Sequence, residues 1–252
     1  MFPIRLKSFA IFVTLLALPF QACTDDNPKT SSPTAENSQE PEQASQGNTS
    51  VAKQARFITE DGEEISGLVY GQGDIGIVLA HMRGRGQSSW SNFGKTASES
   101  GYVALTFDFR GYGDSTGTKD RRMDRDLEAA IRYMLFVENV RKVVIIGASM
   151  GGTAAITIAD EYNVAAVAAL SPSTSYGRID ALEAASTMKT PLLLVVAEND
   201  PPFNGYASSL LAAASTTRYL ELTGSQHGTN LFAEHDIDLT EQLLAFVYAQ
   251  TR

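Results

Sequence analysis

The chain has 252 residues, of which 43% are hydrophobic and 19% charged, a composition typical of globular proteins. Its 20 basic and 29 acidic residues give a formal net charge of −9. This argues against binding to phosphate backbones, so we expect no nucleic-acid partner. The single cysteine, Cys23, excludes a disulfide within the chain and a metal site built from several cysteines.

The first residues have the pattern of an export signal. Arg5 and Lys7 form a basic start, and the stretch from Ser8 to Phe20 is mostly apolar. That stretch is shorter than the roughly 20 residues that a membrane-spanning helix needs, and it is typical of the central part of a signal peptide. We therefore predict that residues 1–22 are a signal peptide.

Ala22 and Cys23 follow, and this site resembles a bacterial lipoprotein signal, in which the cysteine is acylated and becomes the new N-terminus. Such signals usually have leucine three residues before the cysteine, where this chain has Phe20. The resemblance implies a membrane anchor through lipid on Cys23, because two or three acyl chains bind a bilayer firmly. Because Thr24 rather than aspartate follows, we expect the periplasmic side of the outer membrane in a host with two membranes. An ordinary secreted protein is the alternative.

Residues 24–52 are rich in Ser, Thr, Pro, Gln, Asn and Glu and contain almost no large apolar side chain. Such a segment cannot bury enough apolar surface to offset the entropy lost on ordering. We predict that it is a flexible tether. Residues 53–252 are predicted to form the folded domain.

Apolar runs alternate with amphipathic stretches through this domain. Strands are predicted over Phe57–Thr59, Ile65–Tyr70, Ile75–Ala80, Tyr102–Asp108, Val143–Ile146, Val164–Leu170, Pro191–Val196 and Arg218–Leu222. Helices are predicted over Ser88–Ser100, Asp124–Glu138, Gly151–Tyr162, Ile179–Met188, Tyr206–Ala214 and Leu239–Ala249. Asp238 and Glu241 have the spacing of a capping box at the start of the last helix. This alternation predicts a mostly parallel sheet with helices on both faces, whose functional sites lie at the carboxyl ends of the strands.

One motif with chemical meaning follows a buried strand and precedes a helix: Gly147-Ala148-Ser149-Met150-Gly151. A sharp strand-to-helix turn crowds the backbone on both sides of the serine. Glycines at the two outer positions relieve this crowding and leave the hydroxyl exposed above the sheet. The helix that begins behind Ser149 adds backbone N–H groups and the positive end of its dipole. The motif therefore predicts a nucleophilic serine.

With this motif the chain resembles the α/β-hydrolase family, and within it the small members without a cap domain, such as dienelactone-hydrolase-like esterases. The segment from Asp108 to Ser115 is similar to the family's loop after its fourth strand, and His81-Met82-Arg83-Gly84 to its oxyanion loop after the third. The resemblance covers residues 55–252. It implies an α/β-hydrolase fold with a mostly parallel, eight-stranded sheet and helices on both faces.

A serine nucleophile needs a base, and the base needs an orienting carboxylate. In the family these follow in the order serine, acid, histidine. After Ser149, His227 stands in the loop where the family places its base, while His235 is expected to be a solvated surface residue. Asp200 matches the position of the acid, and Glu198 is its competitor.

The tetrahedral intermediate needs two backbone N–H donors in an oxyanion hole. Met150 is expected to supply one, and the resemblance places the other at Arg83, with Met82 as the alternative. The family usually has glycine where this chain has Met82, which restricts the loop. The side chains of Arg83 and Arg85 are candidates for attracting an anionic substrate, or else are solvated. His81 resembles the family's structural histidine.

The short segment between Leu170 and Pro191 leaves no room for a cap domain. We therefore expect an open, shallow site suited to short acyl groups. Trp90, Tyr176 and Phe203 are candidates for lining it, or for packing beside it.

These features predict a monomeric serine hydrolase, without cofactor or metal, that cleaves a small-molecule carboxylic ester and is tethered to the bacterial cell envelope. A thioesterase, a peptidase or a cofactor-free haloperoxidase would use the same triad. A surface binding lipoprotein that keeps the fold without catalysis is the alternative from another class. Asp108 and Asp114 are expected to structure their loop rather than to act in the triad.

Overall fold

The computed structural model describes residues 52–252. The predicted signal peptide over residues 1–22, the predicted lipidation site at Cys23 and residues 24–51 of the predicted tether lie outside the described residues. In the described part of the chain, none of the helices combines the length and the apolar character that a membrane span requires.

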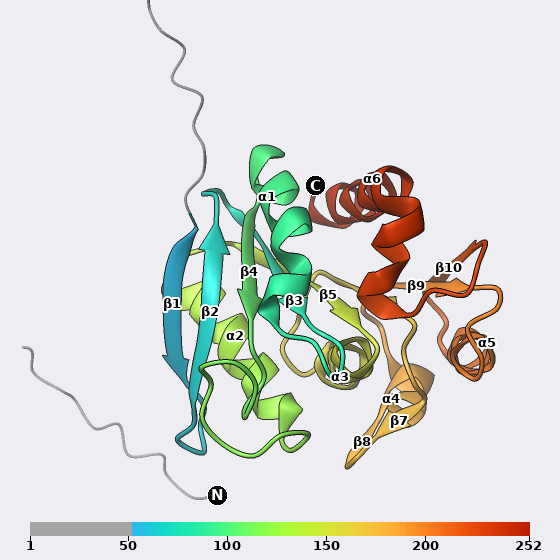
Figure 1. Ribbon diagram of the computed structural model, residues 1–252, viewed down its shortest axis with the longest axis horizontal. Helices are drawn as coiled ribbons and strands as arrows, with labels where there is room; N and C mark the ends of the chain where they lie inside the picture. The colour runs from blue at the N-terminus through green and yellow to red at the C-terminus, as the bar shows by residue number, and fades with distance from the viewer. Residues whose placement is uncertain (1–51) are drawn as a thin grey trace, which may run out of the picture. The chain divides into compact units, whose positions relative to one another are not determined.

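One twisted sheet forms the centre of the domain (Figure 1). Its strands are β1 (Lys53–Ile58), β2 (Glu64–Tyr70), β3 (Ile75–Ala80), β4 (Val103–Phe107), β5 (Lys142–Ala148), β6 (Ala166–Leu170), β9 (Leu192–Ala197) and β10 (Thr217–Leu222). Their order across the sheet is β1-β2-β4-β3-β5-β6-β9-β10. The pairs β1–β2 and β2–β4 are antiparallel, and every other pair is parallel. The carboxyl ends of the parallel strands therefore meet at one edge.

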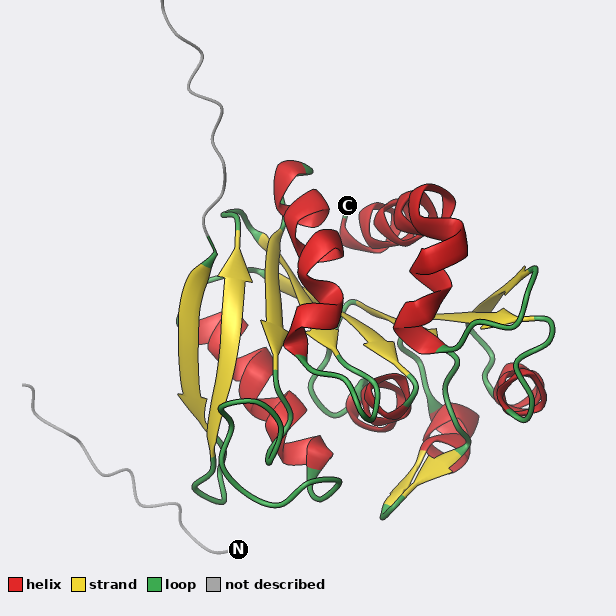
Figure 2. Cartoon of the chain, in the orientation of Figure 1, coloured by secondary structure: helices red, strands yellow, loops and turns green. Residues whose placement is uncertain are grey.

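Helices cover both faces of the sheet (Figures 1 and 2). They are α1 (Ser91–Glu99), α2 (Met123–Phe136), α3 (Met150–Ile158), α4 (Ala181–Thr187), α5 (Phe203–Ala213) and α6 (Phe232–Thr251), with 3-10 turns η1 (Gln87–Trp90) and η2 (Gly228–Leu231). Strand β3 shows how the faces are divided. Ile77 and Leu79 are buried in the cluster with α1 and α6, whereas Val78 and Ala80 are buried in the cluster with α2 to α5. Period-two alternation of apolar residues explains this division.

The predicted sheet strands and helices are all present, with ends that differ by a few residues, except for the start of the last helix. That start is wrong: α6 begins at Phe232, so Asp238 lies within the helix and caps nothing. The irregular point is His235, whose backbone leaves the helical region while its Nε2 lies 2.9 Å from the Thr223 carbonyl oxygen. The break in this helix thus coincides with a contact to the preceding loop, which a local capping pattern does not contain.

The segment between β6 and β9 contains a small hairpin and α4, and no cap domain. The hairpin, β7 (Ser175–Tyr176) paired with β8 (Ile179–Asp180), was not predicted, because strands of two residues have no readable alternation. The Asp180 side chain accepts a hydrogen bond from the Glu183 backbone N–H at 2.9 Å and caps α4. The carboxyl ends of β5, β6 and β9 are therefore not covered by an inserted domain.

Candidate active site

Ser149 lies at the turn between β5 and α3 with φ 48° and ψ −114°. Non-glycine residues rarely adopt such a conformation, which costs of order 1–3 kcal/mol and must be held by the surrounding structure. The turn is held from the neighbouring strand, because the Ser149 backbone N–H donates to the Leu170 carbonyl at 2.7 Å. The side chain is half-buried, and its hydroxyl makes no hydrogen bond within residues 52–252. The hydroxyl is thus presented at the strand ends.

The two outer glycines of the motif allow this close turn. A Cβ on Gly147 would lie 2.5 Å from the Gly151 carbonyl oxygen, and one on Gly151 would collide with the backbone oxygens of Ala80 and His81. Any side chain there would push α3 away from the sheet. The crowding that the sequence predicted is therefore present at both glycines.

His227 and Asp200 are brought together from the loops after β10 and β9. The His227 Nδ1 lies 2.9 Å from Asp200 Oδ2, and the Asp200 side chain is only 8% exposed. Since an ionised carboxylate only accepts, the Nδ1–H donates, and in the neutral form of the ring Nε2 then carries the lone pair. The imidazole is therefore in the tautomer that a base acting on a serine hydroxyl needs.

The competing acid, Glu198, and the competing histidine, His235, have other partners. Glu198 is exposed, and its Oε1 accepts from the Asn199 side chain at 3.2 Å. His235 contacts the Thr223 carbonyl, as described above. Asp200, rather than Glu198, is thus the carboxylate that contacts His227.

Two residues that hold the histidine were wholly or partly missed from the sequence. The Phe203 ring packs on the His227 imidazole with centroids 4.1 Å apart. The Ser171 hydroxyl, fully buried at the end of β6, accepts from the Gly228 backbone N–H at 3.1 Å. Phe203 was predicted to line the site or to pack beside it, and its contact with His227 was not predicted. Ser171 was not singled out, although it is the first residue after a buried strand beside the one that carries Ser149.

The loop after β3 packs through Met82 against the loop that carries His227, called the histidine loop below. Its side chain is 7% exposed, and its Sδ would lie 2.7 Å from a Cβ on Gly228, whose φ is +57°. Arg83 follows Met82, and the Arg85 backbone N–H donates to the Met82 carbonyl at 3.2 Å. Met150, the other expected oxyanion donor, is the first residue of α3. The methionine in place of glycine thus fills the space beside Gly228.

His81 is fully buried under this loop. Its Nε2 accepts from the Phe109 backbone N–H at 3.0 Å, so Nδ1 carries the proton and donates to the Met82 carbonyl at 2.8 Å. The rings of Phe109 and Tyr112 meet it edge-on. Burial lowers the pKa of His81, although Asp108 and Asp120 act in the opposite direction. These contacts fit the structural role that the resemblance implied.

This environment predicts a pH-dependent contribution to stability. The unfolded chain protonates His81 near pH 6.5, whereas the folded state keeps it neutral to lower pH. The contribution is complete above pH 6.5 and is lost as the pH falls below it, at up to about 1.4 kcal/mol per pH unit. Urea unfolding between pH 7.5 and 5.5 should show a steeper loss for the wild type than for His81→Gln. His235→Gln serves as the control, and equal slopes for wild type and His81→Gln would contradict the prediction.

The carboxylate of Asp108 joins the loop after β4 to η1. It accepts from the backbone N–H and the side chain of Gln87, each at 2.8 Å. Asp114 is exposed and makes no hydrogen bond within the described part of the chain, so its expected structuring role is not seen. Trp90 is fully buried against Phe93 and Phe232, and so packs beside the site rather than lining it.

A second carboxylate joins the loops beside the serine. Asp120 accepts from the Tyr112 hydroxyl at 2.8 Å and from Arg83 Nε at 3.2 Å. Burial and a hydrogen bond to Asp120 are among the causes that raise the pKa of Tyr176, in the β7–β8 hairpin. The loops after β3, β4 and β6 therefore meet at Asp120.

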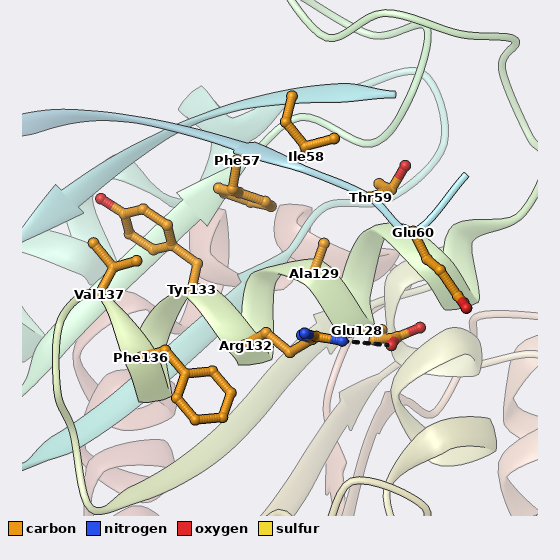
Figure 3. Close-up of a pocket in the computed structure, with 10 residues that line it drawn as sticks. All are labelled: Phe57, Ile58, Thr59, Glu60, Glu128, Ala129, Arg132, Tyr133, Phe136 and Val137. Atoms are coloured by element: carbon orange, nitrogen blue, oxygen red, sulfur yellow. Dashed lines mark ion pairs between the residues drawn. The ribbon is translucent and has the colours of Figure 1, made fainter. Parts of the chain in front are cut away.

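No group of three or more His, Cys, Asp or Glu side chains within residues 52–252 is arranged to hold a metal. A hollow of about 400 Å³ lies between β1 and α2 (Figure 3). It is lined by apolar side chains such as Phe57 and Tyr133 and by the Arg132–Glu128 ion pair, and none of the triad candidates reaches it.

Comparisons with known proteins agree with this architecture. Residues 77–186 match the model of the Alpha/beta hydrolase family. A 2-hydroxy-6-oxononadienedioate/2-hydroxy-6-oxononatrienedioate hydrolase of Pseudomonas sp is 30% identical over 118 residues, which are 44% of this chain and 42% of that protein. The hydrolase of the same name from Escherichia coli (strain K12) is 32% identical over 90 residues, 34% of this chain and 31% of that protein. The chain thus spans less than half the length of these curated relatives.

Solved esterases have the same arrangement of elements. An esterase of Pyrococcus furiosus superposes with a TM-score of 0.68 at 18% identity, covering 80% of this chain and 93% of that one. A thermophilic esterase of Thermogutta terrifontis superposes with a TM-score of 0.68 at 14% identity, covering 80% of this chain and 100% of that one. The chain has the α/β-hydrolase fold, and this prediction is confirmed.

Proposed function

We propose that the protein is a serine hydrolase of the Alpha/beta hydrolase family that cleaves small carboxylic esters. One observation carries the proposal: the buried Asp200 carboxylate contacts His227 Nδ1 at 2.9 Å, in the loops that flank the strained turn at Ser149. An imidazole oriented by a carboxylate, beside a serine whose hydroxyl has no hydrogen-bond partner within residues 52–252, is the constellation that acyl transfer needs.

The proposed reaction has two halves. His227 Nε2 takes the proton from Ser149 Oγ as the oxygen attacks the ester carbonyl, and the resulting oxyanion is held by the backbone N–H groups of Met150 and Arg83. The intermediate collapses, and His227 gives the proton to the leaving alcohol. Water, deprotonated by the same imidazole, then attacks the acyl-enzyme. The imidazolium returns this proton to Ser149 Oγ as the acyl–oxygen bond breaks, which releases the acid and free Ser149.

An open site supports small substrates. Ser149 is half-buried, and the segment between β6 and β9 contains only a short hairpin and α4. Without a cap, little apolar surface is available to bind a long acyl chain, so the proposed substrates have short acyl groups or are presented on a larger molecule. This is the small, capless, dienelactone-hydrolase-like type that the sequence resembles.

The direct test is labelling with a fluorophosphonate probe, followed by peptide mapping, beside a panel of p-nitrophenyl esters of increasing chain length. We expect covalent labelling at Ser149 and faster turnover of short esters. Ser171, which is also a serine at a strand end but fully buried, is the internal control and should remain unlabelled. An unlabelled Ser149 together with no ester turnover would exclude the mechanism and favour a binding protein.

A second candidate reaction comes from the curated relatives, which are hydrolases named for 2-hydroxy-6-oxononadienedioate. Hydrolysis of a ketone-bearing dioate on the same triad is therefore an alternative to ester hydrolysis. One assay distinguishes these two reactions, because an ester hydrolase should have a much higher kcat/KM on p-nitrophenyl acetate than on the oxo-dioate. Thioester and peptide substrates belong in the same panel.

We also propose that Cys23 anchors the protein to the bacterial envelope through lipid. The support is the sequence of the signal, since these residues lie outside the described part of the chain. Mass spectrometry of the N-terminal peptide should find an acylated Cys23, and globomycin, which blocks processing of lipoprotein signals, should cause the precursor to accumulate. An unmodified Cys23 in the mature protein would exclude the anchor and favour secretion.

A further inference from the structure

The loop after β3 carries two arginines whose surroundings differ. Arg83 forms an ion pair with Asp120, with Nε and Oδ2 3.2 Å apart, so its charge is offset. Arg85 instead donates from Nη2 to the Asn230 side-chain oxygen at 3.2 Å, a neutral partner. Within residues 52–252 no carboxylate pairs with Arg85, and four of its five N–H donors remain available.

The guanidinium of Arg85 lies at the junction of the oxyanion loop and the histidine loop. Its own backbone N–H closes a turn onto the Met82 carbonyl at 3.2 Å. Its partner Asn230 is in η2, and the Asn230 backbone N–H donates to the His227 carbonyl at 3.0 Å. The unpaired positive charge is thus connected by two hydrogen bonds to the proposed general base.

The connection to His227 indicates which part of the substrate Arg85 is nearest to. In the proposed mechanism His227 must deliver its proton to the leaving-group oxygen, so the leaving group lies on the His227 side of Ser149. Arg85 is hydrogen-bonded to Asn230 of η2, the turn that directly follows His227. Arg83, by contrast, is directed to Asp120 in the loop after β4.

We propose that Arg85 binds a carboxylate on the leaving group, so that the preferred substrates are esters of hydroxy acids. This inference rests on the proposed function. A guanidinium with free donors matches the two oxygens of a carboxylate. The chain has a net charge of −9, so its overall field repels anions, and an anionic substrate needs a local cation of this kind.

The test compares two esters that differ in one charge, 4-acetoxybenzoate and its methyl ester, with the wild type, Arg85→Ala and Arg85→Lys. Arg85→Ala should lower kcat/KM on the anionic ester by about three- to tenfold and leave the neutral ester unchanged, because a hydrogen-bonded but partly solvated charge pair is of this strength. Arg85→Lys should keep part of the preference for the anionic ester over the neutral one. Added salt should weaken the same preference in the wild type.

Arg141→Ala is the matched control. It removes the same charge, but Arg141 lies just before the amino end of β5, at the opposite edge of the sheet, where it pairs with Asp74. We expect it to leave both esters unchanged. A third substrate, mono-4-nitrophenyl glutarate, has its carboxylate on the acyl side and should be insensitive to Arg85→Ala.

Several results would overturn the inference. An equal loss on both esters in Arg85→Ala would mean that Arg85 only positions the histidine loop, and no loss on either would mean that it is merely solvated. A loss confined to the glutarate would place the anion on the acyl side. If the wild type cleaves no ester and Ser149 is not labelled, the proposed function fails and the inference with it, which is distinct from the other outcomes.

Discussion

Replacement of Ser149 by alanine is expected to lower kcat on short p-nitrophenyl esters by about 10⁴- to 10⁶-fold, with little change in KM. The hydroxyl forms the covalent bond in the proposed reaction, and no other described residue occupies the strained turn between β5 and α3. Removal of the nucleophile leaves only the weak catalysis that the oxyanion hole provides. The measurement is steady-state kinetics on highly purified protein.

The matched control for this prediction is Ser171→Ala, which removes a buried hydroxyl from the neighbouring strand end. It takes away the acceptor for the Gly228 N–H, so we expect a partial loss of kcat and lower stability, but continued labelling of Ser149 by the fluorophosphonate. Full activity in Ser149→Ala would show that Ser149 is not the nucleophile and that another residue has this role.

Asp200→Asn is expected to lower kcat by about 10⁴-fold. The amide has no charge to stabilise the imidazolium that forms when His227 takes the serine proton, and its NH₂ group favours the wrong tautomer of the ring. Because the Asp200 side chain is only 8% exposed, water cannot replace its charge. Kinetics across pH 6 to 9 and a circular dichroism spectrum measure the effect on activity and on folding separately.

Glu198→Gln provides the comparison. Glu198 is exposed at the same turn and contacts Asn199 and the Gly224 backbone rather than the imidazole. We expect its kcat to stay within about twofold of the wild type, as for most surface changes. A larger loss in Glu198→Gln than in Asp200→Asn would assign the acid to Glu198.

The sequence was sufficient to predict the elements that carry the triad candidates. Apolar runs specified every strand of the large sheet, and Gly147 and Gly151 predicted the tight turn around Ser149. One prediction failed. The capping pattern at Asp238 was interpreted from neighbours in the chain, whereas α6 begins at Phe232 and contacts the loop after β10 through His235. The β7–β8 hairpin was not predicted, because each of its strands is two residues long.

The choice between near-equivalent side chains also depended on tertiary structure. Asp200 and Glu198 are two residues apart after the same strand, and local pattern alone left both as candidates for the acid. Of these two carboxylates, it is Asp200 that contacts the imidazole in the fold. The side chains of Arg83 and Arg85 were likewise equal candidates for attracting an anion, and their partners Asp120 and Asn230 distinguish them.

By itself, the sequence determined the class of fold and the places where chemistry is possible, because alternating burial and tight-turn glycines are properties of short segments. The tertiary structure decided which side chains meet: Asp200 with His227, Ser171 with the histidine loop, Arg83 with Asp120, and Arg85 with Asn230. The physical reason is that these contacts join loops from different strands, and only the parallel sheet brings the ends of those strands to one edge.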